Sequence, residues 1–252
     1  MDYRGITLRN YLDNEIADSR WREGVEILYG ISSGLNRVHR SGFVHGNLHG
    51  GNVLVNDRRD VFVLGFGLLS DIETTDPNDP NALYGVLPYI APEILNGGAH
   101  TEKSDVYSFG IIMTEMTTGK PPFYDRPHDE NLAKQICEGL RPEINRNVTP
   151  RIYFELAKRC LDSDPTKRPT FEELETTLQF WFAVLDGFGG FDGEKAPIAA
   201  GIRESFRVVD NPIVVPSYQL HKGASYVTSK LNFGKIHSPP RNREDHYTFH
   251  SH

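Results

Sequence analysis

Hydrophobic residues recur every three or four positions over residues 21–40, a spacing that places them on one face of an α-helix. The face consists of Trp21, Val25, Leu28, Ile31, Leu35 and Val38. Gly42 then stands where a left-handed helix cap is expected. Two short apolar runs follow at residues 53–55 and 61–64, joined by a polar stretch. This pattern predicts a long helix and then a small β-hairpin.

A different pattern covers residues 103–118, where apolar side chains occur on most sides of the expected helix. Such a helix is predicted to be buried. Asp105 lies within it and needs a partner, because an unpaired buried carboxylate is very costly. Amphipathic helices are also predicted at residues 131–138, at 152–161, and from the T-x-x-E capping box at 170–173 toward residue 185. The expected fold class is mainly α, with one domain over residues 1–186.

Residues 187–252 show no sustained periodicity, and their composition changes. They hold eight Lys and Arg against six Asp and Glu, a balance of +2, whereas the whole chain carries −7. We predict an irregular, disordered tail. Its histidines are scattered, so no metal site is expected there. Residues 218–233 contain enough apolar and aromatic side chains to serve as a short binding segment.

Composition narrows the function classes. Hydrophobic residues make up 38% of the chain, and no apolar run approaches the length of a membrane span. Two cysteines, Cys137 and Cys160, are too few for a disulfide framework. The acidic balance, without a basic cluster, makes nucleic acid an unexpected partner. We therefore expect a cytoplasmic protein that binds neither membrane nor nucleic acid.

The candidate catalytic residues lie in residues 44–55, between the first predicted helix and the hairpin. The sequence there is V-H-G-N-L-H-G-G-N-V-L-V. Glycine permits backbone geometry that other residues resist, so the stretch predicts a tight loop. It resembles the catalytic loop of protein kinases, H-R-D-L-x-x-x-N. His45, Leu48 and Asn52 match that motif. Gly46 replaces its Arg, and Asn47 replaces its Asp.

Four further motifs follow in the order of that family. They are L-G-F-G at residues 64–67 in place of D-F-G, A-P-E at 91–93, S-D-V-Y-S-F-G at 104–110 and P-T-K-R-P-T at 165–170. The chain thus resembles the C-terminal lobe of a protein kinase. The H-x-x-L-H-x-G-N form of the loop resembles the tyrosine-kinase-like group.

The resemblance implies roles for several residues. Glu93 and Arg168 would form an ion pair, and Asp105 would accept hydrogen bonds from the backbone of the loop. Phe66 would have a structural role. Leu54 would lie beneath the adenine of a nucleotide, although a plain core role is equally compatible with the sequence.

The resemblance also implies an activation segment, and it implies that the chain begins at the hinge of the family. Residues 65–93 correspond to the activation segment, where Thr74, Thr75 and Tyr84 are candidate phosphorylation sites by residue type. Residues 1–12 resemble the hinge that follows the N-terminal lobe. We therefore expect that lobe to be absent, together with its glycine-rich loop and its phosphate-binding Lys.

Two substitutions affect the family's reaction directly. Asn47 is a poor base in place of the Asp that orients the substrate hydroxyl, and Gly65 removes a carboxylate that binds magnesium. Asn52, the other metal ligand of the family, remains. One amide oxygen is too little for a hard dication, so we expect binding of ATP and magnesium to be lost or very weak.

The sequence therefore predicts a pseudokinase, a kinase-like domain that is not an enzyme and serves as a binding or scaffolding module. Its expected partner is a protein, such as an active kinase or a kinase N-terminal lobe. Two alternatives stay open. The chain could be a fragment that transfers phosphate only with an N-terminal lobe, or it could be a degenerate gene product.

Overall fold

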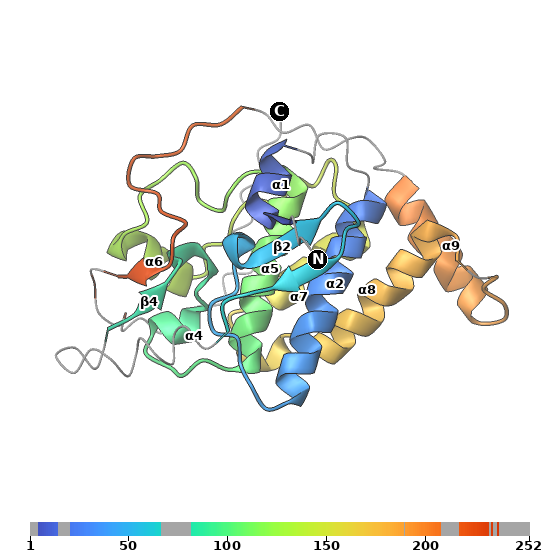
Figure 1. The fold of residues 1–252 in the computed structure, drawn as a ribbon, viewed down its shortest axis with the longest axis horizontal. Helices are drawn as coiled ribbons and strands as arrows, with labels where there is room; N and C mark the ends of the chain where they lie inside the picture. Colours follow the sequence, from blue (N-terminus) through green and yellow to red (C-terminus); the bar gives the residue numbers. More distant parts are fainter. Residues whose placement is uncertain are drawn as a thin grey trace.

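The computed structural model describes residues 5–14, 21–66, 82–188, 190–207, 217–231, 233 and 236. Helices dominate it (Figure 1). The α-helices are α1 (Leu8–Asn14), α2 (Trp21–Arg40), α4 (Pro92–Leu95), α5 (Glu102–Thr118), α6 (Glu130–Cys137), α7 (Arg151–Cys160), α8 (Phe171–Asp186) and α9 (Lys195–Arg207). Short 3₁₀ helices are η2 (Gly50–Asn52), η3 (Leu87–Tyr89) and η4 (Pro165–Lys167). The strands are β1 (Gly5–Thr7), β2 (Val53–Asn56), β3 (Val61–Val63), β4 (Tyr84–Gly85) and β5 (Ser229–Lys230).

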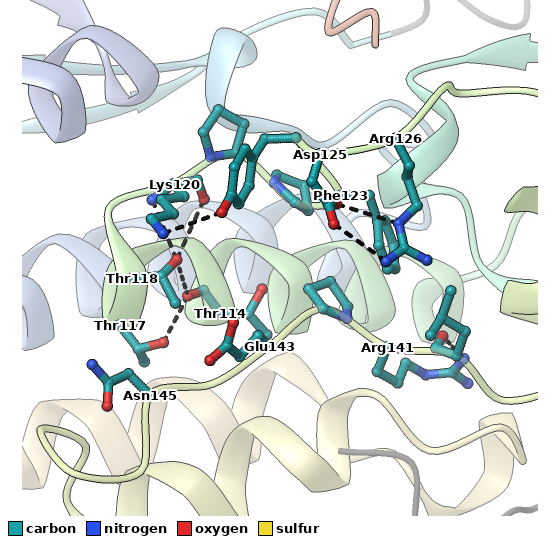
Figure 2. A pocket seen from close by; sticks show the side chains of 15 residues that line it. Thr114, Thr117, Thr118, Lys120, Phe123, Asp125, Arg126, Arg141, Glu143 and Asn145 are labelled. Carbon is teal, nitrogen blue, oxygen red and sulfur yellow. Dashed lines mark hydrogen bonds and ion pairs between the residues drawn. The ribbon is translucent and has the colours of Figure 1, made fainter. Parts of the chain in front are cut away.

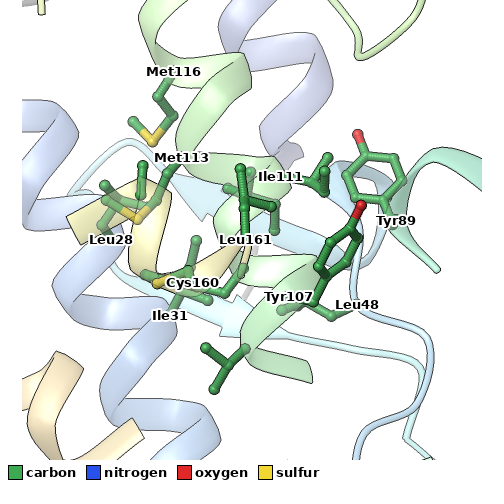
Figure 3. Close-up of a cluster of buried hydrophobic side chains, with 14 of the residues drawn as sticks. Leu28, Ile31, Leu48, Tyr89, Tyr107, Ile111, Met113, Met116, Cys160 and Leu161 are labelled. Atoms are coloured by element: carbon green, nitrogen blue, oxygen red, sulfur yellow. The ribbon is translucent and has the colours of Figure 1, made fainter. Parts of the chain in front are cut away.

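Helix α5 lies at the centre of the core. Every residue from Ser104 to Thr117 is buried, as its all-round apolar sequence predicts. Figure 3 shows side chains of α2, α5 and the end of α7 converging in one cluster, among them Leu28, Met113 and Cys160. Helix α8 packs along α2 and begins at the predicted capping box. The predicted helices therefore form with nearly the expected bounds.

The predicted hairpin forms from β2 and β3. β1 adds a third antiparallel strand, pairing Ile6 with Val55, which the sequence did not predict. The fold class of a mainly helical domain with a small sheet is therefore observed. No helix among the described residues is long and apolar enough to cross a membrane.

Two segments within residues 187–252, α9 and β5, differ from the predicted irregular, disordered tail. Helix α9 buries Ala199, Ile202 and Phe206, and the Phe206 ring lies 5.9 Å from Trp21 and 5.7 Å from Trp181. Farther on, β5 pairs antiparallel with β4. The prediction of disorder is wrong for these segments, because apolar contacts and strand pairing to distant residues hold them in place.

An ion pair connects the start of α4 to the segment before α8. The Arg168 side chain is fully buried, and its two terminal nitrogens lie 2.6 and 2.8 Å from the Glu93 carboxylate oxygens. Arg168 also donates to the carbonyl oxygens of Asp162 and Lys103, each at 2.8 Å. The pair thus satisfies a buried charge while it connects three segments.

We expect Glu93→Gln to lower the free energy of unfolding by about 3 kcal/mol, because it leaves the buried guanidinium without a counter-charge. Urea unfolding of the full chain measures this. Glu130→Gln is the matched control, since the pair of Glu130 with Lys134 is half-exposed and is worth less than about 1 kcal/mol. Equal losses in the two variants would contradict the role given to Glu93.

Candidate functional site

The loop between α2 and β2 is fixed by one buried carboxylate. Asp105 of α5 is 0% exposed and accepts hydrogen bonds from the backbone nitrogens of His45 and Gly46, each at 2.8 Å. Nε2 of His39, at the end of α2, lies 2.8 Å from the same carboxylate. Asp105 therefore holds the end of α2, helix α5 and the loop in a fixed arrangement.

His45 connects this loop to the segment at residues 64–66. Its Nδ1 accepts a hydrogen bond from the backbone nitrogen of Asn47 at 3.1 Å, and its Nε2 lies 2.8 Å from the carbonyl oxygen of Leu64. In the neutral ring, Nε2 must therefore carry the proton and donate to Leu64. Burial lowers the pKa of His45, although Asp105 opposes the shift. The Phe66 ring lies 4.5 Å from the imidazole.

The two asparagines of the loop are neighbours. Nδ2 of Asn52 donates to the carbonyl oxygen of Asn47 at 2.9 Å, and the backbone nitrogen of Leu64 donates to the carbonyl oxygen of Asn52 at 2.8 Å. Asn47 is buried, with 5% of its surface exposed. The loop thus brings together His45, Asn47 and Asn52, all three singled out from the sequence.

Gly65 closes the space beside Asn52 to any side chain. Its φ is +86°, in the left-handed region that favours glycine, and a Cβ there would lie 2.7 Å from Nδ2 of Asn52. An aspartate at this position would therefore require the Asn52 side chain to shift. The loop contributes the Oδ1 of Asn52, and the described residues contain no group of three or more His, Cys, Asp or Glu placed to hold a metal ion. These residues do not fit a magnesium-bound nucleotide.

A residue from the far end of the chain completes the site. The hydroxyl of Thr228 lies 3.0 Å from Nδ2 of Asn47, 3.3 Å from its Oδ1 and 3.2 Å from Nε2 of His49. His49 also caps η2, because its Nδ1 accepts a hydrogen bond from the backbone nitrogen of Gly51 at 3.1 Å. Burial and the neighbouring His45 lower the pKa of His49 to about 4, so the ring is neutral at pH 7.

Leu54 lies on the outward face of the small sheet. It is half-buried and pairs across the strands with Phe62, which is 36% exposed. Leu64 and Phe66, which follow β3 in the chain, are each 44% exposed. Leu54 is therefore on a surface rather than in the centre of the core, a position compatible with the predicted contact to a nucleotide.

Comparison with known proteins assigns the family. A family model described as protein tyrosine and serine/threonine kinase matches residues 3–178. The chain belongs to the protein kinase family.

The chain is similar to several kinases that are much longer. It is 30% identical over 183 residues to a probable serine/threonine-protein kinase of Dictyostelium discoideum, covering 67% of this chain and 10% of that protein. A protein of Acanthamoeba polyphaga mimivirus named as a serine/threonine-protein kinase/receptor is 35% identical over 181 residues, covering 68% and 11%. The chain spans about a tenth of the length of these curated relatives.

These relatives correct one prediction. The expectation that the chain is not an enzyme rested on Asn47 and Gly65 and on the expected absence of the N-terminal lobe. The family match and relatives named as serine/threonine protein kinases point to an enzyme instead, so that expectation is wrong. The absence of two carboxylates does not by itself determine whether a kinase domain is catalytically active.

One buried network of the kinase domain could not be predicted from the sequence. Glu115 is buried, accepting hydrogen bonds from Arg9 at 2.8 Å and from the hydroxyl of Tyr89 at 2.7 Å. No local pattern signals this long-range network.

Of the candidate phosphorylation sites, Tyr84 lies in β4 and is half-buried, whereas Thr74 and Thr75 lie outside the described residues.

A pocket of about 360 Å³ lies apart from the catalytic loop, lined by the end of α5 and by residues 120–126 and 140–145 (Figure 2). Its polar groups largely pair with one another. Lys120 donates to the hydroxyl of Tyr124 at 3.2 Å, and Arg126 contacts Asp125 at 3.3 Å. We assign no chemistry to it.

The backbone at Gly65 gives a direct stability test. We expect Gly42→Ala to lower the free energy of unfolding by about 1–2 kcal/mol, from backbone strain alone. Gly65→Ala should lower it by more, because its Cβ also meets Asn52. Gly42 is a matched control, because its φ is +81° with no atom within 4 Å of an added Cβ. Thermal unfolding of both variants measures the difference. Equal losses would show that Asn52 does not restrict position 65.

Proposed function

We propose that the chain is the substrate-binding part of a serine/threonine protein kinase domain, in which the loop at Asn47 orients a protein hydroxyl. The observation that carries the proposal is the fixed loop. Asp105 holds its backbone through His45 and Gly46, and His45 attaches it to Leu64. The serine/threonine kinases among its relatives support the substrate class.

Asn47 limits how well this loop can work. Its Oδ1 can accept a hydrogen bond from a hydroxyl and so orient it, but a neutral amide does not take up the proton. A general base typically contributes about 10²–10⁴ in rate. We therefore expect phosphate transfer that is slow compared with a kinase that has a carboxylate at this position.

We further propose that nucleotide binding depends on groups other than those of the described loop, since Asn52 alone is a poor metal ligand. The exposed apolar surface of Leu54, Phe62 and Leu64 supports contact with a kinase N-terminal lobe, because such a lobe would cover it. The form of the loop supports placement in the tyrosine-kinase-like group.

A second candidate function is protein binding by the surface beside β4. The observation that favours it is the extended segment already paired there, β5. A strand edge that accepts one segment through backbone hydrogen bonds can accept another. This surface would serve a binding or scaffolding role alongside catalysis.

The experiment compares transfer of labelled phosphate from ATP to a serine- and threonine-containing protein by the wild-type chain and by Asn47→Asp, each supplied with a kinase N-terminal lobe. We expect the variant to be faster by about 10²-fold or more, because it regains a base. Asn147→Asp controls for the added charge, since Asn147 is exposed. Gly65 stays unchanged, because an added Cβ would lie 2.7 Å from Nδ2 of Asn52 and disturb the loop. Absence of transfer in every variant, or no gain in Asn47→Asp, would contradict the proposal.

A further inference from the structure

Residues 217–231 run along the site as one extended segment, which we call the strap. Figure 1 shows it in orange-red, coming from the C-terminal part of the chain toward β4. Backbone hydrogen bonds attach it along its length. His221 donates to Tyr124 at 2.8 Å, Gly223 accepts from His128 at 2.9 Å, and Leu231 donates to Leu83 at 2.8 Å.

The strap places one hydroxyl against the catalytic loop. Since Nδ1 of His49 accepts a hydrogen bond from Gly51, the neutral ring carries its proton on Nε2 and donates it to Thr228. Nδ2 of Asn47 donates to the same hydroxyl oxygen, while Oδ1 of Asn47 is placed to accept the hydroxyl hydrogen. Every hydrogen-bonding position of this hydroxyl is therefore used, one by His49 and two by Asn47, the residue that the proposed function assigns to substrate orientation.

The rest of the strap binds through its backbone and through two tyrosines, Tyr218 and Tyr226, the first of which donates its hydroxyl to Asp13 at 2.7 Å. Ser229 pairs with Gly85 and Lys230 with Tyr84, and both residues are exposed. Tyr226 donates its hydroxyl to the carbonyl oxygen of Pro122 at 2.9 Å. Such contacts tolerate many sequences, with the hydroxyl at position 228 and the aromatic ring at 226 as the specific features.

Apolar side chains of the strap are more exposed than the core side chains of α9. Val227 is 72% exposed and Leu220 is 53% exposed, whereas Ala199, Ile202 and Phe206 of α9 are almost fully buried. Tyr226 and Leu231 of the strap pack against the core but are only partly buried. Since apolar burial supplies most of the free energy that holds a segment in place, we expect the strap to be held less firmly than α9.

We infer that the groove between β4 and the loop at residues 45–49 is a binding site for extended peptides with a Thr or Ser hydroxyl, and that the strap fills it. This inference deepens the proposed function, because Thr228 takes the place of a substrate hydroxyl. The strap competes with protein substrates for Asn47, and its release opens the groove. The segment from Tyr218 to Phe233, expected to be a binding segment, thus binds its own domain.

Hydrogen–deuterium exchange of the full chain tests the attachment. Thr228→Val keeps the shape of the side chain and removes the hydroxyl. We expect exchange of residues 221–231 and of β4 to become about tenfold faster, the effect of losing one or two hydrogen bonds. Exchange in α9 should not change. Val227→Ala is the matched control on an exposed neighbour, and Thr228→Ser should restore protection.

A labelled synthetic peptide of residues 217–231, titrated by fluorescence anisotropy, tests the groove. We expect it to bind Thr228→Val at least tenfold more tightly than the wild-type chain, because the variant's own strap competes less. The same peptide with valine at position 228 should bind more weakly. Neither assay contains ATP, so a failed kinase assay leaves both results interpretable. Unchanged exchange at β4, or a peptide that binds neither chain, would overturn the inference.

Discussion

One buried carboxylate determines the geometry of the site. Asp105 is fully buried and accepts hydrogen bonds from two backbone nitrogens of the loop. The side chain of His39, at the end of α2, contacts the same carboxylate. A carboxylate in the core is tolerated only when its oxygens are fully used. The loop cannot move away without leaving that charge unsatisfied, so its backbone is as firmly placed as α5 itself.

This constraint explains how the loop keeps its form without the acidic side chains of its family. The donors from the loop to Asp105 are backbone groups, and the link from His45 to Leu64 also ends on a backbone oxygen. None of these bonds depends on the side chain at position 47 or at position 65. Asn47 is therefore presented in a defined place, where it binds a hydroxyl, while the local negative charge is missing. This kinase domain therefore keeps the geometry of the loop but lacks the negative charge at positions 47 and 65.

The sequence predicted the parts of the fold that depend on short-range patterns. The period of α2, the all-round apolar sequence of α5 and the capping box of α8 each gave an element with nearly its observed bounds. The loop residues His45, Asn47 and Asn52 were also found, because they stand in a motif with fixed spacing. The left-handed backbone of Gly65 and its contact with Asn52 could not be predicted from the glycine alone.

The tail was mispredicted for a physical reason. The pairing of β5 with β4 joins residues about 145 positions apart, and such pairing leaves no period in either segment. Helix α9 did carry a signal, since Ala199, Ile202 and Phe206 follow helical spacing. The role of Thr228 depends on His49 and Asn47 together, and only the folded chain brings these three residues into contact.

Amide exchange at His45 and Gly46, compared between the wild-type chain and Asp105→Asn, tests the central claim most directly. An amide side chain has one acceptor oxygen and turns its NH₂ group toward donors, so it cannot satisfy the same three partners. The account predicts exchange at least a hundredfold faster at both amides in the variant, while Glu102→Gln, an exposed change on the same helix, has no effect. Slow exchange retained at both positions would contradict it.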